Sequence, residues 1–358
     1  MTLAEIEVDD TEQAIELFHR KGWTDGLPIV PPTPERVARF LAAANRHADD
    51  EIGFYEERRI PVTAGKLAIN AVMAGCLPEH FPVVLAIVDG MLSPDLPLHV
   101  ANSSTGSFTY GFIVNGPIRK TLNMNWQGNM LGPGNRANSS IGRAIRLIQL
   151  NVLGSIPGAG DDHPAHGRVV LDRSMMGQPA KYATYHIVEN EEDFPELKPV
   201  HVELGYEPED STVTLLVIGG YAWMDGHGEQ TPEAWIESFA HSVVAANRLV
   251  NRGPAVVLMP PENAQLFVNA GWSKQDIRDA LFAATRRSIA WVKENGYRLA
   301  LQRLRNEPVR SGDEERFVAI SGSAEPKDLH IVVCGGPAGG WPFYLHAVGE
   351  SVTRKIQV

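Results

Sequence analysis

Apolar residues recur at helical spacing through most of the first 150 residues. A Ser or Thr cap followed by an apolar stripe predicts the start of a helix. The pattern predicts four helices before residue 92: Thr11–Lys21, Glu35–Asn45, a segment that Thr63 begins, and Glu79–Met91. From Leu98 to Ile118, short apolar runs separated by Gly, Ser and Asn indicate strands. A further helix is expected to begin at Ser139 or Ser140.

The second part of the chain alternates between strand and helix patterns. We expect strands at Thr212–Ile218, Ala255–Met259 and Leu329–Cys334, and helices at Pro232–Val250, around Glu262–Ala270 and at Ser273–Val292. This order predicts a parallel or mixed sheet covered by helices, and hence a mixed α/β fold. The Pro- and acid-rich segment Leu197–Glu209 marks the expected boundary between an N-terminal domain, 1–200, and a C-terminal α/β domain, 201–358.

Composition and charge narrow the classes of partner. The chain has 358 residues, of which 44% are hydrophobic, and a net charge of -11, which disfavours nucleic acid. Only two cysteines occur, which favours a reducing compartment. We find no signal-peptide pattern and no apolar run of the ~18–20 residues that a membrane span needs. We therefore expect a cytoplasmic protein that binds neither nucleic acid nor membranes.

The densest polar composition lies between Asn102 and Arg143, where amides, hydroxyls and glycines alternate. Such groups suit a small polar ligand, and the approach to the helix near Ser139 offers backbone N–H groups to a carboxylate or oxyanion. The alternative is a surface loop of Asx and Ser turns. The substrate-binding residues that we expect are Asn102, Ser104, Asn115, Asn135, Arg136 and Arg143.

Cys76 lies at the junction of two expected helices, just before a helix N-terminus, where the helix dipole stabilises a thiolate. Glu79 and His80 follow closely and could carry protons. We therefore predict Cys76, Glu79 and His80 as catalytic residues, the alternative for Cys76 being a small core residue. Cys334, at the end of an apolar strand, is expected to lie in the core.

Cofactor and metal sites find less support. The run from Gly132 to Ala137 fits G-x-G-x-x-A, but no apolar strand precedes it, so we expect no dinucleotide. Histidines and carboxylates cluster at Asp161–His166 and Asp225–His227, without the spacing of a helical zinc motif. We predict neither a cofactor nor a metal. Two strands are followed by glycine pairs, Gly219-Gly220 and Gly335-Gly336, which could line a pocket or simply form tight turns.

Several segments together resemble bacterial UGSC-like (seleno)proteins. They are Trp23–Thr33, Ala71–Glu79, Asn115-Gly116-Pro117, Gly132–Gly142 and Val333–Pro337. The resemblance implies thiol or selenol chemistry. This chain has no U/C-Gly-Ser-Cys run, so Cys76 is the residue left to carry a reactive sulfur.

The function that we predict is an enzyme acting on a small anionic or carbonyl-containing metabolite by lyase, hydratase or hydrolase chemistry, through the Cys76 thiolate. Two alternatives stay open: a metabolite-binding or oligomeric structural protein without catalysis, and a metal-dependent hydrolase. Trp272 and Trp341, if exposed, could mark an interface between copies of the chain.

Overall fold

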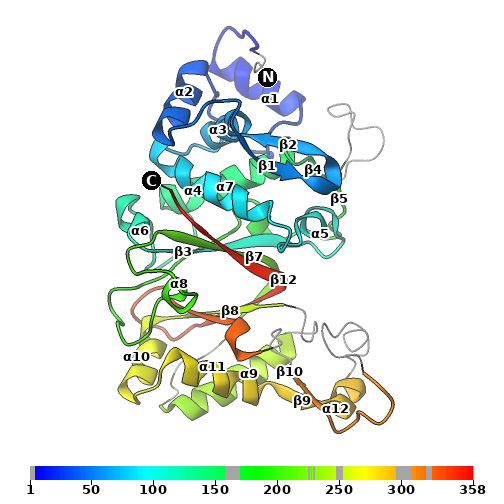
Figure 1. The fold of residues 1–358 in the computed structure, drawn as a ribbon, viewed down its shortest axis with the longest axis vertical. Coiled ribbons are helices and arrows are strands. Elements are labelled where there is room, and N and C mark those ends of the chain that lie inside the picture. Colours follow the sequence, from blue (N-terminus) through cyan, green and yellow to red (C-terminus); the bar gives the residue numbers. More distant parts are fainter. Residues whose placement is uncertain are drawn as a thin grey trace.

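A computed structural model describes residues 5–157, 170–224, 226, 228, 230–246, 253–295, 309–319 and 325–357. It confirms a mixed α/β fold, with a central sheet between two groups of helices (Figure 1). In the described part of the chain, no helix has the length and apolar character needed to cross a membrane.

The central sheet has six strands. In sheet order they are β11 (Leu329–Val333), β8 (Ala255–Met259), β12 (Phe343–Lys355), β7 (Thr212–Trp223), β3 (Thr109–Asn115) and β6 (Tyr185–Val188). β11 pairs in parallel with β8, and β6 in parallel with β3, whereas all other neighbours are antiparallel. The set β3, β6 and β7 therefore has the same order and directions as the set β8, β11 and β12. Two copies of one three-stranded unit meet where β7 pairs with β12.

The sheet curls so that the ends of its two edge strands approach each other. Just beyond β6, the backbone N–H of Asn190 donates a hydrogen bond of 2.7 Å to the carbonyl of Val333, the last residue of β11. The carboxyl ends of β6 and β11 therefore lie side by side. Ligands of open α/β sheets bind outside the carboxyl ends of strands, so this is where a site is expected.

The helices above the sheet in Figure 1 come from the N-terminal part of the chain. They are α1 (Thr11–Arg20), α2 (Pro34–Ala43), α3 (Ala64–Met73), α4 (Phe81–Met91), α5 (Leu98–Ser103), α6 (Ile118–Thr121) and α7 (Arg136–Asn151). Small strand pairs accompany them: β1 (Glu51–Tyr55) with β2 (Ile60–Thr63), and β4 (Ser155–Pro157) with β5 (Val170–Asp172). The apolar faces of α3, α4 and α7 form one core with the sheet.

The second group of helices lies below the sheet (Figure 1). It comprises α9 (Pro232–Ala246), α10 (Pro261–Asn269), α11 (Lys274–Ala284) and α12 (Ile289–Glu294), beside the pair β9 (Arg286–Ser288) and β10 (Phe317–Ala319). The short helix α8 (Val200–Glu203) is drawn at the level of the sheet. A second core joins α9, α10 and α11 to β8 and β11. The pattern of apolar residues placed most of these elements within a few residues of their observed bounds.

Several expectations differ from the structure. Leu98–Ser103 is a helix and not a strand, and the strands β6 and β12 were not predicted. The single helix expected at Ser273–Val292 is divided into α11, β9 and α12. β7 does not stop at Gly219-Gly220 but continues to Trp223. The ring of His346 on β12 lies where side chains would stand at these two positions, which explains why both are glycine. The boundary that we expect at residues 200 and 201 lies in α8 (Val200–Glu203), between β6 and β7 of the same sheet, and the division into two domains stays a prediction.

Candidate functional site

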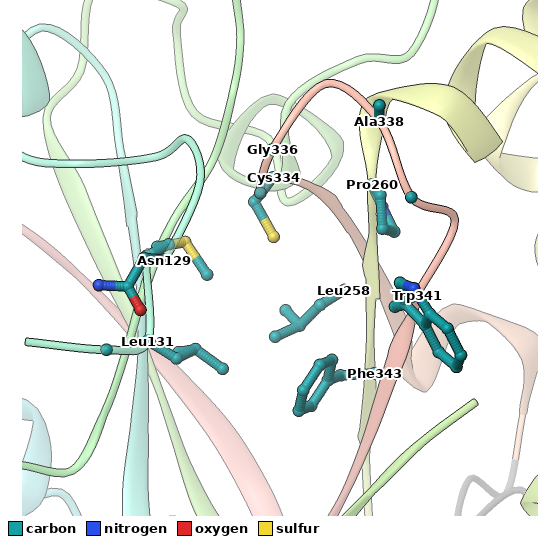
Figure 2. Close-up of a pocket in the computed structure, with 13 residues that line it drawn as sticks. Asn129, Leu131, Leu258, Pro260, Cys334, Gly336, Ala338, Trp341 and Phe343 are labelled. Atoms are coloured by element: carbon teal, nitrogen blue, oxygen red, sulfur yellow. The ribbon is translucent and has the colours of Figure 1, made fainter. Parts of the chain in front are cut away.

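A pocket of about 290 Å³ lies beyond the carboxyl ends of β8 and β11 (Figure 2). One wall is the segment 129–132, which belongs to the polar stretch that the sequence singled out. The other wall is the glycine-rich segment 334–341, and Leu258 and Phe343 from the sheet complete the lining. Gly335-Gly336 thus lines a pocket, as the sequence suggested, and the lining is more apolar than the composition of the stretch predicted.

Backbone contacts hold the two glycine-bearing walls together. The N–H of Gly335 donates to the carbonyl of Trp126 at 2.8 Å, and Gly335 also forms a bridge with Gln127. Gly335 has a φ of +97°, a left-handed conformation that glycine adopts without strain. Further along, the Glu262 carboxylate accepts the N–H groups of Gly339 at 2.6 Å and Gly340 at 3.1 Å. The walls are therefore fixed by hydrogen bonds and not by apolar contact alone.

The thiol of Cys334, the residue directly after β11, points into this pocket (Figure 2). Its side chain is buried, and its one hydrogen bond in the described part of the chain is a weak one to the Val332 carbonyl, at 3.7 Å. Burial raises the pKa of the thiol, Glu189 raises it further, and Lys274 opposes them. The expectation that Cys334 lies in the core is confirmed, and the same residue also lines the pocket. The glycine pair after a buried strand was the signal that pointed there.

A buried ionic cluster lies next to Cys334, at the end of β6. Glu189 and Lys274, whose side chains are each 1% exposed, form an ion pair of 2.6 Å. Asn115, expected to bind substrate, instead donates from Nδ2 to Glu189 at 2.6 Å and to Glu191 at 2.9 Å. Its Oδ1 has no partner in the described structure. Sequence spacing gave no sign of this cluster, because Glu189 and Lys274 are 85 residues apart.

The structure places Cys76, His80 and Ser140 together at the first turns of α7. Ser140 hydrogen-bonds the Cys76 thiol, and its Oγ lies 3.4 Å from His80 Nδ1. Nδ1 also accepts the backbone N–H of Leu77 at 3.2 Å. Burial raises the pKa of Cys76 to about 12 and lowers that of His80 to about 4. The thiol is therefore protonated at neutral pH, unlike the thiolate that the helix dipole suggested, and Glu79 is exposed beside it.

The polar residues at the start of α7 are occupied by contacts within the chain. Asn135 is the N-cap of α7 and accepts the N–H of Asn138 at 3.0 Å. Arg136 Nε donates to the carbonyl of Gly75, next to Cys76, at 3.0 Å. Arg143 binds both carboxylate oxygens of Asp25 at 2.9 Å. These three residues were predicted to bind substrate, and the structure shows them tying neighbouring segments to α7.

Asn102 and Ser104 lie in a third place, beneath β5. Asn102 is buried, and its Oδ1 accepts from Tyr110 at 3.2 Å and from Gln149 at 3.3 Å. Ser104 Oγ accepts the N–H of Gly106 within a local turn. The predicted substrate-binding residues are thus spread over three separate places, and none of them lines the pocket of Figure 2.

Neither histidine-rich segment can be placed, because residues 161–166 and the residues Asp225 and His227 lie outside the described part of the chain. Within the described part, no three His, Cys, Asp or Glu side chains are arranged to hold a metal ion. No model of a known protein family matches this chain, and no curated protein matches it either.

Proposed function

We propose that the protein is a cytoplasmic enzyme that acts on a small metabolite with a carbonyl or carboxylate group, by lyase, hydratase or hydrolase chemistry, and that Cys334 is its reacting residue. The observation that carries this proposal is the Cys334 thiol pointing into a pocket at the carboxyl ends of two parallel strands. Thiol chemistry is also what the resemblance to UGSC-like proteins implies. We place the reacting group at Cys334 and not at Cys76, because Cys76 does not line this pocket.

The pocket offers partners for both ends of such a substrate. Leu258, Phe343 and Trp341 can contact its apolar part. Gly336 and Ala338 line the same pocket. Within the described structure their backbone N–H groups make no hydrogen bond, so they can donate to an oxygen of the substrate. In the step that we propose, the sulfur–carbon bond forms as the C=O π bond breaks, and the thiol proton passes to the carbonyl oxygen. No oxidant or reductant is needed.

A second candidate is a metabolite-binding protein without catalysis. The observation that favours it is the raised pKa of Cys334, whose sulfur contacts no base in the described structure. Binding without turnover would then stabilise the folded protein by mass action. Self-association stays a prediction: Trp341 is exposed and packs edge-on against exposed Trp223, at 5.1 Å between ring centroids, whereas Trp272 is half-buried against Phe267.

The two candidates are separated by one set of variants. Small aldehydes, 2-oxo acids and carboxylic esters are screened for thermal stabilisation of the protein and for turnover. We expect Cys334→Ser to abolish turnover while it keeps ligand-induced stabilisation, and the matched variant Cys76→Ser to keep both. Full turnover by Cys334→Ser would overturn the catalytic role of this thiol. Stabilisation of the wild-type protein by a compound that is never converted would favour the binding protein.

A further inference from the structure

The two copies of the three-stranded unit place Glu189 and Cys334 at equivalent positions. Each is the first residue after the second parallel strand of its unit. Each also continues the same ladder: the N–H of Glu189 donates to the carbonyl of Val114 on β3, and the N–H of Cys334 donates to that of Met259 on β8. The bond from Asn190 to Val333 places the ends of β6 and β11 side by side, and the charge of Glu189 acts on the Cys334 thiol.

Glu189 is held in place by three donors. Its Oε1 accepts from Lys274 at 2.6 Å, and its Oε2 accepts from Asn115 at 2.6 Å and from the backbone N–H of Val200 at 2.8 Å. Two of these donors, Asn115 and the N–H of Val200, do not depend on the lysine. Glu189 is therefore held by hydrogen bonds as well as by its ion pair with Lys274.

Lys274 lies at a helix position that disfavours a cation. It is the first residue of α11, which Ser273 and Asp276 cap, and a cation at a helix N-terminus opposes the helix dipole. A fully buried ion pair is also weak support for stability, because desolvation offsets the attraction of the charges. Neither the helix nor the core accounts for a buried lysine here, which leaves its effect on neighbouring groups as the role to test.

The charges that act on Cys334 come from two elements. Burial is the largest cause of the raised pKa of the thiol. Glu189, at the end of β6, raises this pKa further, and Lys274, on α11, lowers it. Around the lysine lie Glu203, Arg278 and His330, of which Glu203 and Arg278 form their own ion pair. The net effect of charge on the Cys334 thiol therefore depends on Glu189 and Lys274 together.

We propose that Glu189 and Lys274 are positioning residues whose opposite charges set how readily the Cys334 thiol gives up its proton, and so how fast it reacts with a molecule in the pocket. This inference rests on the proposed function only in taking Cys334 as the reacting group. Its test measures the reactivity of the thiol and not turnover, so this inference and the proposed function can fail separately.

The test is the rate of alkylation of Cys334 by iodoacetamide between pH 6 and 10, followed by mass spectrometry in folded protein that carries Cys76→Ser. In this step the sulfur–carbon bond forms, iodide leaves and the thiol proton goes to solvent. We expect Glu189→Gln to speed alkylation about tenfold at pH 7.5, and Lys274→Met to slow it about tenfold, because one pKa unit changes the thiolate fraction tenfold. The double variant should return to within about threefold of the parent.

The control is Asp172→Asn, which removes a buried carboxylate paired with Lys181 at 2.6 Å in another part of the fold and should leave the pH profile of alkylation unchanged. Circular dichroism verifies that each variant is folded. If Glu189→Gln does not fold, the shift of Lys274→Met to higher pH relative to the double variant decides the inference. The inference is overturned if the profiles coincide, or if both single variants shift in the same direction, as a general loosening of the pocket would produce.

Discussion

A single experiment can decide whether Arg143 binds substrate or has a structural role. Its guanidinium binds both carboxylate oxygens of Asp25 at 2.9 Å and donates to the carbonyl of Pro28 at 2.8 Å. These contacts tie the extended N-terminal segment to α7. We expect Asp25→Asn to lower the free energy of unfolding and to leave the affinity for a pocket ligand unchanged.

The size of the loss follows from the geometry. Hydrogen bonds to charged groups contribute about 1.5–3 kcal/mol each, and breaking one partner of a buried ion pair costs about 3–5 kcal/mol. The Asp25 side chain is 3% exposed, but that of Arg143 is 18% exposed and keeps its bond to Pro28. Partial screening by solvent therefore brings the expected loss to about 2–3 kcal/mol.

The assay is urea unfolding, followed by tryptophan fluorescence, of the wild type, Asp25→Asn, Arg143→Gln and the double variant. Each single variant should lose about 2–3 kcal/mol, and the double variant should lose clearly less than the sum, because the two residues share one interaction. Losses below about 0.5 kcal/mol in both single variants, with ligand affinity weakened only in Arg143→Gln, would refute the structural role and restore the substrate-binding one.

The pH dependence gives an independent measurement of the same pair. Burial alone would raise the pKa of Asp25, but the hydrogen bonds and charge of Arg143 outweigh it and lower the pKa below 3.8. Since the folded pKa is the lower one, the pair contributes its full stability above pH of about 4, and loses it as pH falls through the folded pKa. The difference between wild type and Asp25→Asn should be constant from pH 8 to 5 and shrink in more acidic solution.

Three further predictions concern other parts of the molecule. Gly116→Ala should lose more than about 2 kcal/mol in urea unfolding, because φ is +81° and the new Cβ would overlap a neighbouring carbonyl, whereas Gly134→Ala, with φ +126° and open space, should lose only about 1 kcal/mol. Burial lowers the pKa of His186 to about 3, so its share of stability falls as pH drops below 6.5, by about 2 kcal/mol at pH 5. His186→Phe should therefore flatten the decline of the unfolding midpoint between pH 7 and 5, and an unchanged slope would contradict this. Ala338→Trp should fill the pocket and block alkylation of Cys334 without lowering the unfolding midpoint, and unimpeded alkylation would show that the reagent does not enter there.

Most of the longer helices and the buried parallel strands β8 and β11 could be predicted from the sequence because their signals are local. The caps Thr33 and Ser273 precede helices as their residue types suggest, and the apolar run Ala255–Met259 is a strand with all five side chains buried. β12 could not be found in this way. It contains Gly349 and its pairing with β7 changes register, so its apolar residues do not alternate.

The site was predicted only in part, and for a physical reason. A segment rich in amides satisfies its own backbone, and Asn135 and Asn138 do so at the start of α7. The composition therefore located one wall of the pocket but not the other residues that line it. Glu189 and Lys274 meet Cys334 only because the sheet curls, and no spacing along one segment records that approach.

The repeated three-stranded unit explains why Glu189 and Cys334, which differ in chemistry, hold equivalent backbone positions. The ladder fixes the backbone after β6 and after β11 in one way, so Glu189 and Cys334 hold equivalent positions at the ends of the two edge strands. With Glu189 at one place and Cys334 at the other, that point holds a fixed charge beside a titratable sulfur. Two carboxylates there would repel each other, and two thiols would have no charge to act on them. In our proposal, this asymmetry between the units is the feature on which the reactivity of Cys334 depends.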